Sequence, residues 1–163
     1  MEQVQDSSEL QLQLQLASRG SRLIAALIDS IVLSIFILPL MYFTGGFESF
    51  TQSPPTEPSW GYLFLLGILN FILFAIINRN LLRDKGQTIG KKWMKIGIRN
   101  QQGDLPKLNE LLFKRYAYYF LIGYVPLIGG VISLVGVLLI FGSSRRCLHD
   151  IIASTQVTRL NDC

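Results

Sequence analysis

The stretch "RLIAALIDSIVLSIFILPLMYF", residues 22–43, is an apolar run that begins after one arginine and contains a single aspartate, Asp29. A helix from Leu23 to Phe43 would be about 31 Å long at 1.5 Å per residue, which matches a hydrocarbon core of about 30 Å. The run is too long for the apolar region of a signal peptide, and it follows a polar leader. We therefore interpret it as a permanent membrane helix.

The composition of the whole chain supports this interpretation. Of the 163 residues, 50% are hydrophobic and 16% are charged, against roughly 25% charged residues in an ordinary soluble domain. The positive mean hydropathy of +0.38 comes from residues 22–43 and from two further apolar runs, Trp60–Ile77 and Tyr116–Phe141. The composition is that of a membrane protein.

The third apolar run is not expected to form one straight helix. Three residues within it interrupt helical structure: Pro126, Gly129 and Gly130. We predict a hairpin whose first arm begins upstream of the run, with the arms at Leu108–Tyr124 and Leu127–Phe141. Both arms are short, so they either span the bilayer with local thinning or form a re-entrant pair.

The positive charges predict the orientation. Residues 44–59, between the first two runs, contain no Lys or Arg and should lie outside the cell. Residues 78–115, between the second and third runs, hold ten of the 15 basic residues and should be cytoplasmic. A hairpin also returns Arg145 and Arg146 to the inside. We therefore predict a multi-pass protein of the cell inner (plasma) membrane with both termini in the cytoplasm.

The expected fold is mainly α and polytopic, with about four membrane helices (two full spans and the Pro/Gly-broken hairpin) and a small cytoplasmic pair of strands. The strands are "WMKIGIRN" (93–100), in which apolar residues alternate with other residues, and "STQVTRL" (154–160). The leader "ELQLQLQL" (9–16) alternates as well and is either a third strand or low-complexity sequence. We divide the chain into a polar leader (1–16), a membrane domain (17–158) and a tail (159–163).

Asp29 needs a partner, because an aspartate near the middle of a spanning helix costs roughly 2.5–3.5 kcal/mol on insertion scales. Arg22 lies on the same face but about 10 Å away along the axis, too far for direct contact. In a structural interpretation, Asp29 lies at the cytoplasmic boundary and pairs with Arg115 or Lys91. In a functional one, it carries a proton or cation, since a carboxylate in a low-dielectric medium binds a proton more readily. The residues leave both open.

Four motifs in one order resemble the RDD family of small membrane proteins: "RLIAALID" (22–29), "GQTIGKKWMKI" (86–96), "LFKRY" (112–116) and "RRCLHDIIASTQV" (145–157). The family is named for one arginine and two aspartates, which carry over to Arg22, Asp29 and Asp150. The other matching residues are Ala25, Gly86, Gln87, Thr88, Gly90, Lys91, Arg115, His149 and Thr155. The resemblance implies a membrane protein; transport of an unidentified ligand is suggested for the family, and cation/proton antiport is attributed to some members.

The "GQTIGKK" motif is not a nucleotide-binding loop. Such a loop has four residues between its glycines and Ser or Thr after the lysine, whereas this motif has three residues and then Lys92. One interpretation is that Gly86 and Gly90 allow a tight turn at the membrane surface, Thr88 caps a short helix, and Lys91 and Lys92 meet anionic lipid headgroups. An alternative places Lys91 opposite Asp29 or Asp150.

His149, beside Asp150, is the sole histidine in the chain. This pair is either a proton relay that titrates near neutral pH or an anchor for a helix end. One histidine without a cysteine cluster does not make a zinc site, and no serine or cysteine has a clear acid–base partner. We therefore expect no metal, no cofactor and no enzymatic activity.

Three function classes follow. The first is a small transporter for a monovalent cation or proton, with Asp29 as carrier, Asp150 or His149 as gate, and Arg22 and Arg115 as counter-charges; its short helices enclose little volume, so we expect a homo-oligomer. The second is a membrane assembly or adaptor protein with a structural polar cluster. The third, a lipid-modifying enzyme, has the least support. Anionic lipid explains the basic cytoplasmic charge without nucleic acid.

Overall fold

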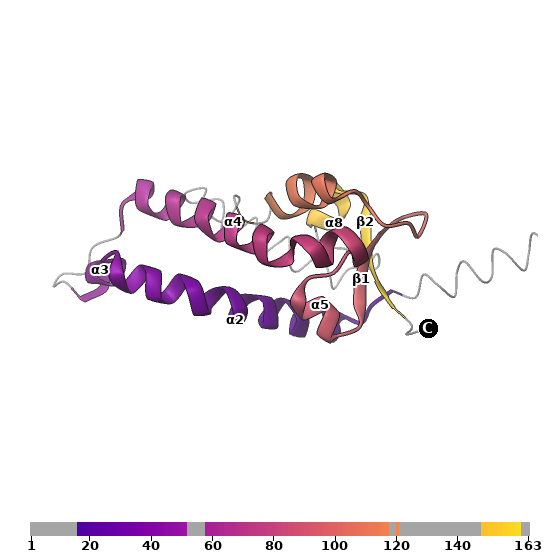
Figure 1. Ribbon diagram of the computed structural model, residues 1–163, viewed down its shortest axis with the longest axis horizontal. Helices are drawn as coiled ribbons and strands as arrows, with labels where there is room; N and C mark the ends of the chain where they lie inside the picture. The colour runs from indigo at the N-terminus through magenta and orange to yellow at the C-terminus, as the bar shows by residue number, and fades with distance from the viewer. Residues whose placement is uncertain (1–15, 52–57, 118–119, 121–147, 161–163) are drawn as a thin grey trace, which may run out of the picture.

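The protein is mainly helical, with two long helices side by side and most of the shorter elements gathered at one end of them (Figure 1). The computed structural model describes residues 16–51, 58–117, 120 and 148–160. The elements in these residues are α2 (Arg19–Phe43), α3 (Glu48–Thr51), α4 (Trp60–Lys85), α5 (Ile89–Trp93), β1 (Ile96–Asn100), the π-helix η1 (Glu110–Ala117), α8 (Leu148–Ile152) and β2 (Thr155–Arg159). We call α5, β1, η1, α8 and β2 together the basal layer.

The two long helices are candidate membrane helices. With 25 and 26 residues, α2 and α4 are each long and apolar enough to cross a bilayer. Only 11% and 17% of the residues in their most apolar stretches are buried, so the described protein leaves most of these side chains uncovered. The first two predicted helices are confirmed, and α4 continues past Ile77 to Lys85.

Local sequence explains where these helices begin and end. The hydroxyl of Ser18 accepts a hydrogen bond from the Ser21 N–H at 3.1 Å, and that of Ser59 accepts one from the Tyr62 N–H at 3.3 Å. Both serines are N-caps, which satisfy N–H groups that the first helical turn leaves free. At the other end of α4, Gly86 adopts the left-handed conformation with φ of 64°, which suits glycine and ends the helix.

Most of the predicted hairpin lies outside the described residues. A helix does begin at Leu108, where the first arm was expected, and it continues as η1. The second arm, 127–141, falls entirely outside them. Two candidate membrane helices are therefore described, and the predicted total of four remains a prediction.

The predicted strand pair is confirmed. β1 and β2 are antiparallel, with Ile98 opposite Val157, and both of these side chains are buried. Leu16 adds one isolated bridge to Thr158. The third strand expected from the leader is limited to this bridge in the described part of the chain, since residues 1–15 lie outside it.

Apolar packing joins the basal layer to the long helices. Phe74 and Leu82 of α4 form one buried cluster with Ile98 of β1 and with Leu111 and Tyr116 of η1. The ring centroids of Phe74 and Tyr116 are 4.6 Å apart. Because each such buried side chain contributes about 1.5–3 kcal/mol, this cluster fixes η1 and β1 against α4.

Gly90 brings α5 into direct contact with α2. A Cβ atom at this position would overlap the carbonyl oxygen of Ala25 and lie 2.8 Å from its carbonyl carbon. We expected Gly90 to allow a tight turn, and that explanation is wrong: Gly90 lies inside α5 and permits close packing of two backbones. Of these two motif glycines, Gly86 alone has the left-handed turn conformation.

We predict that Gly90→Ala destabilises the protein by about 1–3 kcal/mol, because the added methyl group forces two backbones apart. The matched control is Gly61→Ala in α4, where an added Cβ meets nothing within 4 Å and helix propensity slightly favours alanine. Thermal unfolding of both detergent-purified variants would measure the difference. Equal melting temperatures for Gly90→Ala and the wild type would contradict the packing argument.

Candidate functional site

Asp29 binds the N-terminus of α5. One carboxylate oxygen, Oδ1, accepts the Gly90 N–H at 2.8 Å, and the other, Oδ2, accepts the Thr88 hydroxyl at 2.5 Å. The Thr88 hydroxyl oxygen accepts the Lys91 N–H at 3.3 Å and is the N-cap of α5, as predicted. Asn78 of α4 accepts the Ile89 N–H at 2.9 Å.

Three successive N–H groups of α5 are therefore satisfied by side chains, and these come from α2, from α4 and from the N-cap itself. The first N–H groups of a helix have no partner within it, so such acceptors stabilise the helix end. We call Asp29, Asn78, Thr88 and Gly90 the capping site. It joins both long helices to α5.

The ion pairs that the structural interpretation gave to Asp29 are not formed among the described residues. Its described partners are the neutral groups of Thr88 and Gly90, and neither Arg115 nor Lys91 forms an ion pair with it. The Lys91 ammonium instead donates to the Tyr116 hydroxyl at 3.3 Å and lies 5.7 Å from the centre of that ring. The alternative that placed Lys91 opposite either aspartate is also wrong.

The second aspartate, Asp150, is the charged centre of a separate cluster. Its carboxylate forms an ion pair with Arg115 of η1, and the Arg22 guanidinium of α2 lies 3.7 Å from it. All three side chains are deeply buried, with exposed fractions of 1% for Asp150, 3% for Arg115 and 7% for Arg22. We call these three residues the ionic lock.

Strand β2 adds two hydrogen bonds to the lock. Arg115 donates to the Thr155 hydroxyl at 2.6 Å, and Arg22 donates to the Val157 carbonyl oxygen at 2.9 Å. Buried charges are tolerated when they are paired and hydrogen-bonded in this way. The lock thus holds α2, η1, α8 and β2 together.

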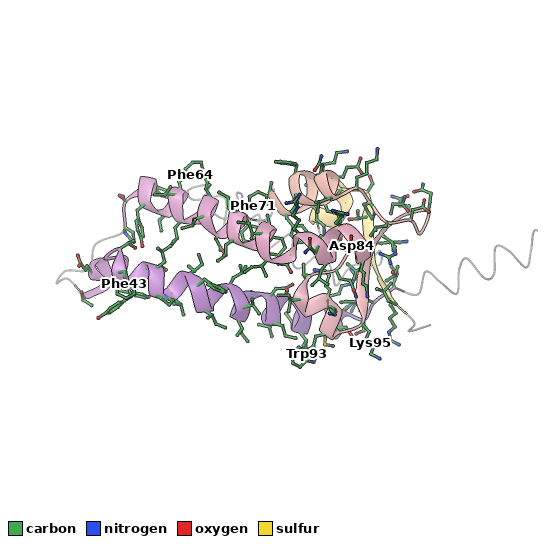
Figure 2. The ribbon with its side chains drawn as sticks, in the orientation of Figure 1. Phe43, Phe64, Phe71, Asp84, Trp93 and Lys95 are labelled. Carbon is green, nitrogen blue, oxygen red and sulfur yellow. The ribbon has the colours of Figure 1, made fainter. Side chains whose placement is uncertain are left out.

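Tyr116 lies between the two parts of the site. Its ring is 5.7 Å from the Lys91 ammonium and 5.8 Å from the Arg115 guanidinium carbon, which are cation–π distances. Figure 2 shows that the basal layer carries many polar side chains, whereas those along α2 and α4 are mostly carbon. The candidate site therefore lies where the apolar helices meet the polar layer.

The remaining motif residues shape the connection from α4 to β1. Gln87 is buried and donates to the Ile96 carbonyl oxygen at 2.9 Å, and a Cβ on Gly86 would lie 2.7 Å from the Ile98 carbonyl oxygen. Arg99 donates to the Lys85 carbonyl oxygen at 2.9 Å. Its partial burial lowers the pKa of the guanidinium below the usual value, yet an arginine this basic stays charged.

Sequence reasoning missed Asn78 and the role of Tyr116. Asn78 follows the second apolar run directly, and a buried amide at the end of such a run is a signal for a helix cap. The amide oxygen of Asn70 in α4 is buried without a donor among the described residues. His149 belongs to α8, but its side chain is not among the described ones. Its predicted role as a proton relay therefore stays a prediction.

No group of three His, Cys, Asp or Glu residues in the described part of the chain lies close enough to hold a metal ion. The two carboxylates of the candidate site lie in different surroundings. Asp29 has neutral donors, and Asp150 has two guanidinium groups.

Two exposed apolar helices above a charged basal layer define a small helical protein of the membrane type. The sequence profile of the RDD family matches residues 16–154, and the chain belongs to this family. The resemblance seen in the four motifs is thereby confirmed. A similar protein is the uncharacterized protein YxaI of Bacillus subtilis (strain 168), which is 26% identical over 147 residues, covering 83% of this chain and 92% of its own. No solved structure matches the chain with statistical significance.

We predict that Asp150→Asn costs about 3–5 kcal/mol of stability, because it leaves two buried guanidinium groups without their carboxylate. Glu110→Gln is the matched control, since it removes an exposed carboxylate that pairs with Lys114 at 3.8 Å and should cost less than about 1 kcal/mol. The yield of folded protein and its melting temperature in detergent would test this. Equal losses in the two variants would rule out the ionic lock as a principal stabilising contact.

Proposed function

We propose that this chain is a small multi-pass transporter of the cell inner membrane that exchanges a monovalent cation for a proton, with Asp29 as the exchanging group. In this proposal the third apolar run supplies a helical hairpin and both termini are cytoplasmic. The family resemblance favours transport, and the two candidate membrane helices fit a membrane location. The basic residues of the basal layer would then face anionic headgroups of the cytoplasmic leaflet.

The observation that carries the proposal is the contrast between the two aspartates. Asp29 lies within a candidate membrane helix, is partly buried, and bonds only to neutral donors among the described residues. A carboxylate in such a position, without a fixed counter-ion there, attracts a small cation. Thr88 and Asn78 place further oxygen atoms near α5, and oxygen is the ligand type that hard monovalent cations prefer.

The same contrast changes the role that we assign to Asp150. Two arginines favour its charged form, which suits a permanent structural anion better than a group that exchanges protons. In the proposal the ionic lock keeps the basal layer in place while Asp29 changes its occupancy. Arg22 and Arg115 serve Asp150 and do not act as counter-charges for Asp29.

A homo-oligomer is part of this proposal. The apolar side chains of α2 and α4 are largely exposed in the described chain, and few short helices enclose little volume. Exposed residues such as Leu27, Ile31 and Ile35 form one stripe along α2, since they are four residues apart. A second copy packed in the membrane would help to enclose a path for ions.

The second candidate function is that of a membrane assembly or adaptor protein. One observation favours it. Asp29 satisfies N–H groups of α5, which is a structural task that needs no transported ion. In that case the polar cluster holds the basal layer in shape, and its exposed surface binds a partner protein. We propose no enzymatic role, because the two family aspartates, Asp29 and Asp150, are engaged in capping and in the lock.

We predict that Asp29→Asn abolishes cation-driven dissipation of a pH gradient in proteoliposomes, tested with sodium, potassium and lithium. Asparagine keeps an oxygen that accepts the Gly90 N–H and an amide that donates to Thr88, so the fold should survive while the charge is lost. Asp84→Asn is the control, because Asp84 is an exposed carboxylate, paired with Arg83, that lies outside the site and should retain full activity.

The two candidate functions separate in this experiment. Activity in the wild type and in Asp84→Asn, but not in folded Asp29→Asn, would support cation/proton exchange. If correctly oriented wild-type protein dissipates no gradient with any of the three cations, antiport is excluded. The assembly function would then be tested by searching for partners of the basal layer.

A further inference from the structure

Helix α5 is bonded to α4 at Asn78. This point lies about one bilayer thickness from Trp60, at the N-terminal end of α4. The apolar stretch of α4 from Trp60 to Ile77 spans about 27 Å, close to the thickness of a hydrocarbon core. It ends at Asn78, whose side chain binds the Ile89 N–H of α5. The exposed residue Arg79 follows directly, so charge begins at the same level. α5 therefore lies at the depth of the inner membrane–water boundary.

The outer side of α5 carries the two kinds of side chain that favour such a boundary. Trp93 is 76% exposed, and the neighbouring residues Lys92 and Lys95 are exposed as well. Figure 2 shows Trp93 on the side of α5 that faces away from α4. Tryptophan is enriched at membrane interfaces, where its ring meets the headgroups, and lysine is attracted to anionic lipid.

The close packing of α5 on α2 fixes which lysine faces outward. Gly90 sits against Ala25, and Lys91 is turned inward to the Tyr116 hydroxyl. Of the two lysines that we expected to meet headgroups, only Lys92 remains exposed. Residues 86–103 contain no Asp or Glu, so no acidic side chain of this segment opposes an anionic ligand.

We propose that Lys92 and Trp93 form an interfacial surface that binds the headgroups of anionic phospholipids. The tryptophan ring lies at the level of the glycerol and phosphate groups, and the Lys92 ammonium concentrates acidic lipid next to it. This inference requires that α2 and α4 span a bilayer, as the proposed function does, but it does not require that the protein transports an ion.

Two single-tryptophan variants of the full chain allow a direct test. Trp60→Phe leaves Trp93 as the only tryptophan, and Trp93→Phe leaves Trp60. Each variant is reconstituted into phosphatidylcholine vesicles with lipids brominated near the headgroup or deep in the acyl chain. We expect both tryptophans to be quenched more strongly by the shallow bromines. Quenching of Trp60 alone would overturn the inference while leaving α4 as a spanning helix, and quenching of neither would overturn both.

Lipid selectivity is measured by energy transfer from Trp93 to a trace of headgroup-labelled phosphatidylglycerol or labelled phosphatidylcholine. Near Trp93 we expect the anionic probe to be preferred, and the preference to fall about fivefold in Lys92→Gln. Lys107→Gln, an exposed lysine beside η1, is the matched control and should leave the preference unchanged. Equal transfer to both probes in the Trp60→Phe protein would overturn the proposed selectivity.

Discussion

A buried carboxylate that must be neutralised organises the basal layer. Asp150 is almost inaccessible to solvent, and the arginines that face it come from α2 and η1. None of these charges is stable in the protein interior alone, so burial of one requires the correct position of the others. The same arginines donate hydrogen bonds to β2, so the strand must also be in its correct position. One ionic contact therefore determines where four separate segments meet.

The other family aspartate, Asp29, has a different structural role, because it caps the N-terminus of α5. A five-residue helix such as α5 is too short to be stable by its own backbone hydrogen bonds. Acceptors from both long helices and the close approach at Gly90 hold it in place. The two aspartates thus have different partners. Asp29 is bound by neutral groups at a helix end, and Asp150 is bound by charged guanidinium groups.

Hydropathy and alternation were enough to predict much of the fold. The two long helices follow from continuous apolar runs, β1 and β2 from short apolar segments, and the Thr88 cap from residue type, because each of these depends on neighbours in sequence. The partners of the charged residues were not predictable in this way. Lys91 meets Tyr116 and Asp29 meets Gly90 only after distant segments pack together. Gly90 looked like a turn residue because the backbone it approaches, at Ala25, is 65 positions away in the chain.

The long sequence separations within the ionic lock have a consequence for biosynthesis. Val157, which accepts a hydrogen bond from Arg22, follows it by 135 residues, and Thr155 follows Arg115 by 40. As the chain leaves the ribosome, both arginines emerge well before the carboxylate and the strand that receive them. They must stay hydrated, or be shielded by other molecules, until that late segment appears. Both α2 and α4 are therefore synthesised before the basal layer can close, and a nascent chain halted before Asp150 would present two unneutralised arginines to the quality-control machinery of the cell.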